Sequence, residues 1–196
     1  DGELILDYTA TNPVNTLLGL PGSVAAQAVW DANFLAVYHF GQDPSVSSIL
    51  DSTVSGYDLV PSGTMLAEDL VDGLIGKAIQ FDGTDDYFEV ADDADLDVGT
   101  TDFTHVIRFR PDNVSGTEYL LNKEAGGVGY GVYKVDDDIY IRFDDNNADA
   151  SGIIISSSLV VGVLYTLVIS YDRSADATAY LYWNTGSSIG STVGTV

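Results

Sequence analysis

The sequence predicts an all-β fold, an antiparallel β-sandwich of two sheets, and three observations lead to it. Short apolar and aromatic runs recur at intervals of roughly 8–14 residues, with Gly, Asp or Asn between them. Several runs alternate apolar and polar residues, which is typical of strands with one buried face. Of the 30 acidic residues only five are glutamate, and aspartate favours turns over helices. With 196 residues, the chain is expected to hold one such domain plus an appendage.

The first part of the chain has the least strand character. Residues 1–32 are expected to form a linker or the tail of a preceding domain, with one short helix over residues 23–30. The sandwich domain is expected to occupy residues 33–196 and to begin with a strand over residues 35–40. A segment rich in Ser, Asp, Gly and Pro over residues 43–63 predicts a loop after it.

Strands dominate the rest of the chain. Two are expected at residues 77–81 and 87–90, around the acidic turn at residues 82–86. The clearest strand spans residues 103–110, where His105 shares a face with apolar residues and is therefore expected to be a core or sheet-face histidine. Further strands are expected at residues 119–123, 130–135, 139–143, 153–156, 165–171 and 178–183, with a hairpin tip of three aspartates at residues 136–138.

The charge of the chain excludes several partners. A net charge of −23 leaves no basic surface for nucleic acid, whose phosphates need clustered Lys and Arg, and it opposes docking on anionic lipid. No apolar run approaches the ~20 residues of a membrane-spanning helix. Many aspartates with few lysines indicate a salty or calcium-rich exterior, so we expect an extracellular, cell-surface or virion location, in a saline habitat as one interpretation. The chain starts at Asp1 without a basic-then-apolar leader, so we expect a processed product or a piece of a longer protein.

Six stretches of the chain, in order, carry a resemblance to a known family. Residues 76–87 read Gly-Lys-Ala-Ile-Gln-Phe-Asp-Gly-Thr-Asp-Asp-Tyr, and residues 102–111 read Asp-Phe-Thr-His-Val-Ile-Arg-Phe-Arg-Pro. The other stretches are residues 36–40, 51–58, 164–172 and 179–186. Together they resemble the laminin G-like, concanavalin A-like lectin-glucanase jelly-roll domains. The resemblance implies a two-sheet jelly roll, with calcium, where present, in loops at one rim of the sandwich.

The chain departs from the family pattern in two places. Members usually continue with further strands after the stretch that matches residues 179–186, whereas this chain stops at Val196. The last strand is therefore expected from residues 189–196, from the N-terminal segment or from a neighbouring chain, or the domain lacks it. In the first loop, residues 53–57 stand where family members have an Asn-rich stretch. The chain therefore lacks side-chain amide oxygens that could bind a metal ion or a sugar there.

The residue patterns needed for catalysis are missing. Glycoside hydrolysis requires two carboxylates across the scissile bond, and no glutamate lies in the alternating acidic pattern of the hydrolases with this fold. His39 and His105 both lie within expected strands, the chain has no cysteine, and it has no nucleophile elbow. We therefore expect no enzyme activity, and a glycan-active enzyme is only a remote alternative.

Calcium is the one cofactor that the residues favour, because it takes about six to eight oxygen ligands and the loops are rich in aspartate. The candidate ligands are first Asp51, Asp58 and Asp82, and then Asp85 and Asp86. A second interpretation is that these aspartates only form turns.

Tyr57 is the expected glycan-binding tyrosine, because it lies in a loop beside Asp58 and is the one whose context favours exposure. Other candidates lie in or next to expected strands, where packing within the sheet is the more common role. They are Tyr87, Tyr130, Tyr133 and Tyr140.

Two functions are left open by the sequence. A non-enzymatic extracellular recognition or adhesion module would bind a glycan or a cell-surface receptor, with calcium-dependent binding as one form of this hypothesis. A structural component of a virion, a surface filament or a surface layer would instead contact neighbouring copies of itself. A sheet face with exposed aromatic side chains favours the first function, and a strand supplied by a neighbouring chain favours the second.

Overall fold

The computed structural model describes residues 30–97, 101–125, 128–144, 151–156, 158–171, 177–184 and 189–195. The chain forms two compact units, one up to Leu96 and one from Asp97 onward, and each is described by itself. The strands pair in antiparallel sheets throughout, which confirms the predicted all-β fold class. The expected helix at residues 23–30 lies outside the described residues, apart from Trp30. The expected domain boundary after residue 32 stays a prediction.

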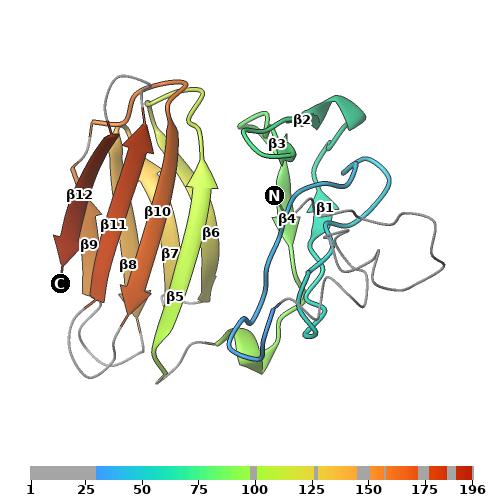
Figure 1. Cartoon of the computed structure of the whole chain (residues 1–196), viewed down its shortest axis with the longest axis horizontal. Helices are drawn as coiled ribbons and strands as arrows, with labels where there is room; N and C mark the ends of the chain where they lie inside the picture. Colours follow the sequence, from blue (N-terminus) through green and yellow to red (C-terminus); the bar gives the residue numbers. More distant parts are fainter. Residues whose placement is uncertain are drawn as a thin grey trace, which may run out of the picture. The chain divides into compact units, whose positions relative to one another are not determined.

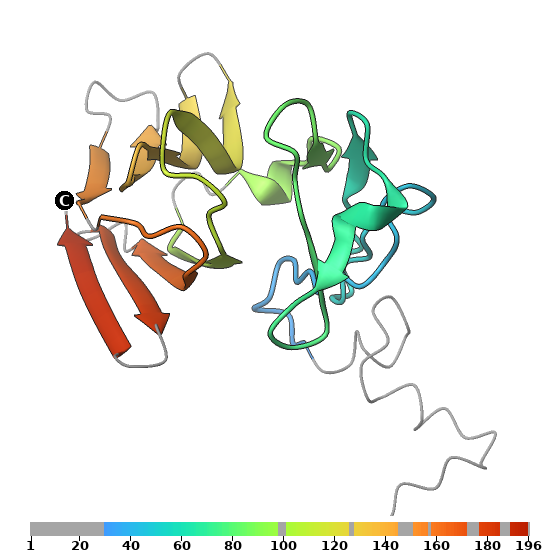
Figure 2. The ribbon, with the colours of Figure 1, turned by 90° about the horizontal axis from the view of Figure 1, so that it is seen from above.

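The C-terminal unit is a sandwich of two four-stranded antiparallel sheets, whose two layers are visible in Figures 1 and 2. The first sheet has the order β12-β11-β10-β5, and the second has the order β6-β7-β8-β9. The bounds in the first sheet are β5 Phe103–Phe109, β10 Leu164–Tyr171, β11 Ala177–Asn184 and β12 Ile189–Thr195. Those in the second sheet are β6 Thr117–Ala125, β7 Val128–Val135, β8 Asp138–Asp144 and β9 Ser151–Ile155.

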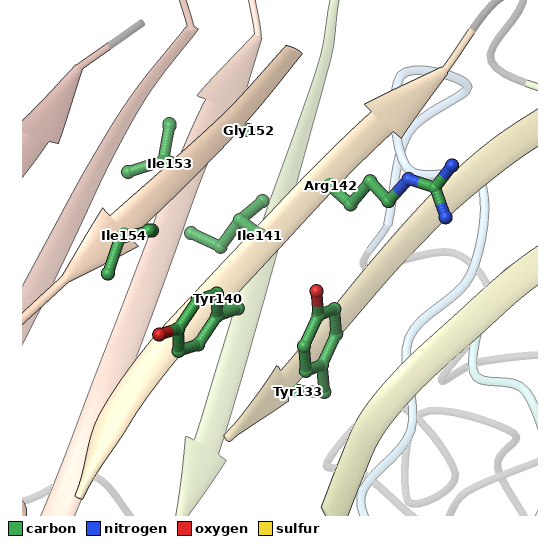
Figure 3. A pocket seen from close by; sticks show the side chains of 7 residues that line it. All are labelled: Tyr133, Tyr140, Ile141, Arg142, Gly152, Ile153 and Ile154. Carbon is green, nitrogen blue, oxygen red and sulfur yellow. The ribbon is translucent and has the colours of Figure 1, made fainter. Parts of the chain in front are cut away.

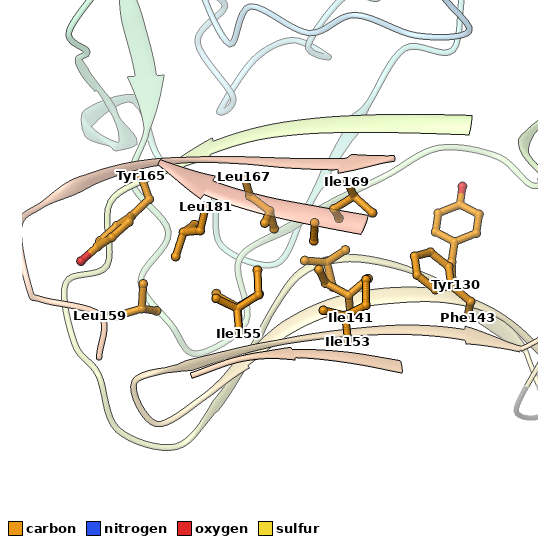
Figure 4. Close-up of a cluster of buried hydrophobic side chains, with 13 residues drawn as sticks. Tyr130, Ile141, Phe143, Ile153, Ile155, Leu159, Tyr165, Leu167, Ile169 and Leu181 are labelled. Atoms are coloured by element: carbon orange, nitrogen blue, oxygen red, sulfur yellow. The ribbon is translucent and has the colours of Figure 1, made fainter. Parts of the chain in front are cut away.

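The core of the sandwich is formed by alternate side chains of the two sheets, which point toward each other (Figure 4). Leu167 and Ile169 of β10 and Ile141 and Ile153 of β8 and β9 are fully buried in it. Each such aliphatic side chain contributes about 1.5–3 kcal/mol when it is buried. The residues between these core positions point outward and determine the two outer faces of the sandwich.

His105 lies on the core side of β5, as the alternation predicts. The centroid of its ring is 5.0 Å from that of Phe103 and 5.1 Å from that of Tyr130, and its Nδ1 is buried without a hydrogen-bond partner. Burial disfavours the charged ring and lowers the pKa of His105 to about 4. The structure therefore confirms the expected core histidine.

Acid is expected to destabilise the protein through His105. The pKa of this histidine is about 6.5 in the unfolded chain and about 4 in the folded chain. The neutral ring therefore contributes fully to the free energy of unfolding above pH 6.5, and this contribution declines as the pH falls toward 4. The full decline corresponds to about 3 kcal/mol. We expect the urea midpoint to fall between pH 6.5 and 5 in the wild-type chain and to change little in His105→Leu. His39→Gln, at an exposed histidine, should retain the wild-type slope, and an unchanged slope in His105→Leu would contradict this account.

The N-terminal unit holds two small sheets joined by irregular segments. The strand β1 (Val60–Ser62) pairs with β4 (Tyr87–Glu89), and β2 (Leu70–Asp72) pairs with β3 (Lys77–Ile79). Two short 3-10 turns, Ala67–Asp69 and Ala94–Leu96, complete its regular structure among the described residues. No helix in the described part of the chain has the length and apolar composition that crossing a membrane requires.

Two predictions for this unit are wrong, one of a strand and one of a loop. Residues 35–40 form no strand, because Tyr38 makes only an isolated bridge with Asp51 and the N–H of Val37 donates to the Asp51 carboxylate. The segment 43–63, expected to be a loop, contains the whole of β1. The expected strands at residues 77–81 and 87–90 do form, as β3 and β4. Each pairs with an earlier strand, β3 with β2 and β4 with β1, and they do not pair with each other across the acidic turn.

Candidate functional site

A row of aromatic side chains crosses the outer face of the sheet β6-β7-β8-β9. Tyr119, Tyr133 and Tyr140 are direct cross-strand partners on β6, β7 and β8, and Ile154 of β9 continues the row. The ring centroids of Tyr119 and Tyr133 are 5.2 Å apart, and those of Tyr133 and Tyr140 are 5.5 Å apart with the ring planes within 11° of parallel. Tyr119 is 58% exposed and Ile154 is 55% exposed, so the row presents apolar surface to solvent. We call these three tyrosines the tyrosine row.

A surface hollow of about 230 Å³ lies beside the tyrosine row (Figure 3). Tyr133, Tyr140 and Ile154 line one part of it, and Arg142 lines another. In Figure 3 the ring of Tyr140 lies between Ile154 of β9 and the ring of Tyr133 on β7, and the Arg142 side chain extends from the same strand as Tyr140. The hollow therefore combines aromatic, aliphatic and cationic groups from three strands.

A glycine contributes to this hollow. The neighbouring cross-strand positions on the same face are Gly131, Arg142 and Gly152, so Arg142 has a glycine on each side. A Cβ at Gly152 would lie 3.3 Å from the carbonyl oxygen of Ile141, a tight contact that a side chain there would have to relieve by a small shift. Gly152 lines the hollow, whereas the side chains of Asn122 and Glu124 lie next to Gly131.

Arg142 provides the polar component of the hollow. Its guanidinium is ion-paired with Glu124 of β6, and the Arg142 side chain is 39% exposed. A guanidinium carries five N–H donors in a planar fork, so one residue can hold a carboxylate and also donate to a ligand hydroxyl. Among the described residues, those that line the hollow are aromatic, aliphatic and glycine residues together with Arg142.

Asp51 is a buried residue with a structural role. Its carboxylate accepts the backbone N–H groups of Val37, Thr53 and Tyr57 at 2.9, 2.9 and 3.1 Å, and the Thr53 hydroxyl at 2.7 Å. Burial alone would raise the pKa of Asp51, but these hydrogen bonds together lower it. Asp58 lies beside it and accepts the N–H of Asp51 at 2.8 Å. Both aspartates therefore order this loop, and their role as metal ligands stays a prediction.

Tyr57 is half-buried in the same loop. Its hydroxyl donates to Asp95 Oδ2 at 3.3 Å, and its carbonyl oxygen accepts the Tyr38 hydroxyl at 2.6 Å. Desolvation, followed by the charges of Asp93 and Asp95, raises the pKa of Tyr57 to about 12. The side chain is thus tied to its own unit, and its predicted role in glycan binding stays a prediction.

The structure brings together three of the five aspartates predicted as metal ligands. Carboxylate oxygens of Asp82, Asp85 and Asp86 all lie within 4.8 Å of one another, and no other group of three or more potential ligands is found among the described residues. The N–H groups of Thr84 and Asp85 donate to Asp82 Oδ1, which lowers the pKa of Asp82. Asp86 Oδ2 accepts the N–H of Asp82, whereas Asp86 Oδ1 is buried without a hydrogen-bond partner. Asp51 and Asp58 are not part of this cluster.

Part of the outer-face site was missed by sequence reasoning. Tyr133 and Tyr140 were considered for glycan binding but interpreted as sheet packing, and Tyr119 and Arg142 were not considered. The alternation of side chains along the two strands could have indicated that Tyr133 and Tyr140 face solvent. Each of them follows an apolar residue, such as Val132, that is buried in the core. The register that aligns the three tyrosines cannot be obtained from that alternation.

The comparison with known families gives one match. Residues 82–196, more than half of the chain, match the model of a laminin G family described as the concanavalin A-like lectin/glucanases superfamily. No curated protein and no solved structure matches the chain. The matched region contains the strands β5 to β12, including the tyrosine row and the hollow.

Proposed function

The chain belongs to the concanavalin A-like lectin/glucanases superfamily, and we propose that it is a non-enzymatic extracellular recognition module that binds a glycan on the outer face of the sheet β6-β7-β8-β9. The superfamily includes both carbohydrate-binding modules and glucanases. A shared fold does not determine function, so the proposal depends on the chemistry of the site.

The juxtaposition of the tyrosine row with Arg142 around one hollow carries the proposal. A sugar ring has an apolar C–H face and a rim of hydroxyl groups, and aromatic surface beside a few polar groups complements both. The hollow is smaller than the roughly 300–1,000 Å³ of a pocket for a drug-sized ligand. We therefore expect a short stretch of glycan, lying along the row, as the ligand.

The same site supports binding without hydrolysis. A glycosidase needs two carboxylates on either side of the scissile bond. The hollow has none in its lining, and the nearby Glu124 is held by its ion pair with Arg142. Hydrolysis would require two carboxylates across the scissile bond, and none is among the described residues that line the hollow.

A glycan array tests the proposed function. We expect saturable binding of the full chain to a subset of glycans, and no release of reducing sugar when those glycans are incubated with the protein in solution. Absence of binding to every glycan on the array would contradict the recognition function, and release of sugar would contradict its non-enzymatic nature.

We also propose that Asp82, Asp85 and Asp86 bind a calcium ion. Three carboxylates within reach of one cation, with the partnerless Asp86 Oδ1 among them, suit calcium, which prefers oxygen ligands from carboxylates and carbonyls. Since both Asp82 and Asp85 are exposed, water would complete the coordination.

Calcium is expected to raise the melting temperature of the protein, and EDTA to reverse the increase. At a calcium concentration of about 100 times Kd, the ligand stabilises the folded state by about 2.7 kcal/mol. Asp86→Asn should remove the response, whereas Asp137→Asn, in the acidic turn between β7 and β8, should retain it. A melting temperature that does not respond to calcium, or a response that survives in Asp86→Asn, would contradict the site.

A further inference from the structure

We propose that Lys134 and Asn113 become joined by an intramolecular isopeptide bond, with Glu118 as the residue that transfers the proton. Lys134 lies on β7 and Glu118 is its direct cross-strand partner on β6, while Asn113 lies in the loop that precedes β6. The three side chains meet at one end of the sandwich, and the proposal does not depend on the proposed glycan binding.

The nucleophile is the amine of a buried lysine. Only 3% of the Lys134 side chain is exposed, which is rare for lysine. Its Nζ lies 3.3 Å from Asn113 Oδ1 and 3.5 Å from Glu118 Oε2, and it also donates to the carbonyl oxygens of Ser115 at 3.0 Å and Gly116 at 3.5 Å. The amine is therefore held within hydrogen-bond distance of the carboxamide that it would attack, in an arrangement that converts a slow bimolecular reaction into an intramolecular one.

The Asn113 carboxamide is held at both of its polar atoms. The N–H of Ser115 donates to Asn113 Oδ1 at 3.1 Å, where it would stabilise negative charge that develops on this oxygen during attack. Asn113 Nδ2, the leaving nitrogen, donates to Glu118 Oε1 at 2.7 Å. Glu118 thus contacts the amine through one oxygen and the leaving group through the other, which allows it to act first as base and then as acid.

Hydrogen bonds hold the loop that carries Asn113 in place before any isopeptide bond forms. The N–H of Gly116 donates to Asp136 Oδ1 at 3.0 Å, and the N–H of Asp136 donates to the carbonyl oxygen of Gly116 at 2.9 Å. These contacts tie the loop to the turn between β7 and β8, so that folding alone brings the reacting groups together.

The reaction balances without any co-reactant. Glu118 takes a proton from the Lys134 ammonium, and the neutral Nζ forms a bond to Asn113 Cγ. The bond between Cγ and Nδ2 then breaks as Glu118 returns this proton to the leaving nitrogen, and the second proton that Nζ loses passes to the departing ammonia, which leaves as ammonium. A lysine ammonium and an asparagine carboxamide yield a secondary amide and one ammonium ion.

Intact-mass spectrometry of the denatured full chain tests the proposal. We expect the wild-type chain to be lighter than its sequence mass by one ammonia molecule. Lys134→Arg, Asn113→Ala and Glu118→Gln should each have their full sequence mass, while Lys77→Arg, at an exposed lysine paired with Asp72, should keep the loss. A wild-type chain at full sequence mass would overturn the proposal, whatever the folding of the variants.

Tryptic digestion distinguishes the isopeptide bond from other reactions that release ammonia, such as cyclisation of an asparagine onto its own backbone. We expect peptide 109–123, which contains Asn113, joined to peptide 124–142, which retains an uncut Lys134 because trypsin does not cleave after an acylated lysine. Recovery of separate peptides ending at Lys123 and at Lys134 would overturn the proposal even if ammonia has been lost.

Discussion

Asp51→Ala is expected to unfold the loops of the N-terminal unit around residues 37–57. The substitution leaves the N–H groups of Val37, Thr53 and Tyr57 without their acceptor. An unsatisfied buried donor costs about 1–3 kcal/mol, so the unit should lose at least about 3 kcal/mol. Hydrogen exchange measures this loss directly, because the amides of these three residues should exchange much faster in the variant.

Asp58→Ala is the matched control for this prediction. Asp58 is half-buried and its carboxylate accepts one backbone N–H, that of Asp51, so about 1 kcal/mol should be lost. Equal exchange rates in the two variants would show that Asp51 does not organise the loop. The pH dependence has a defined sign: the lowered pKa of Asp51 stabilises the fold above the ordinary value of 3.8, and this contribution is lost as the pH falls through the lowered pKa.

Tyr140→Ala is expected to weaken glycan binding at least about tenfold, which corresponds to about 1.4 kcal/mol. Tyr140 is the central residue of the site, because it is the cross-strand partner of both Tyr133 and Ile154 and lines the hollow. Its truncation removes ring surface from the ligand and also the support for the Tyr133 ring. Isothermal titration with a glycan selected on the array measures the change.

Tyr182→Ala provides the matched control for the tyrosine row. Tyr182 is 41% exposed on the outer face of the other sheet, on β11, where it stacks with Tyr180. Its truncation should leave the affinity unchanged. Equal losses of affinity in Tyr140→Ala and Tyr182→Ala would show that the glycan does not bind specifically to the sheet face that carries Tyr140.

The strands of the C-terminal unit could be predicted from the sequence because their side chains alternate cleanly. In β5 the apolar residues Phe103, Ile107 and Phe109 lie on the core side with His105, and both core and strand were expected there. In the N-terminal unit β3 and β4 were expected on either side of the acidic turn, whereas β1 and β2 were not, because three residues are too few for a period of two to be recognised. Side-chain hydrogen bonds to Asp51 replace a sheet ladder in this unit, and no local pattern predicts them.

The candidate site could be predicted only in part, because it depends on strand register. Asp82, Asp85 and Asp86 are close in the chain, so their proximity follows from one turn. Tyr119, Tyr133 and Tyr140 come from three strands, and they align only because β6 has an irregularity between Tyr119 and Leu121 and β7 and β8 pair around a tight turn. A slip of one residue would turn Tyr133 into the core.

Amide chemical shifts recorded during titration with the selected glycan test the central claim most directly. We expect saturable shifts for Tyr133, Tyr140, Arg142 and Gly152, around the hollow on the outer face of β6-β7-β8-β9. The residues around Tyr182 and around Asp82, Asp85 and Asp86 should not shift. Saturable shifts confined to either of those two regions would contradict the assignment of glycan binding to the tyrosine row.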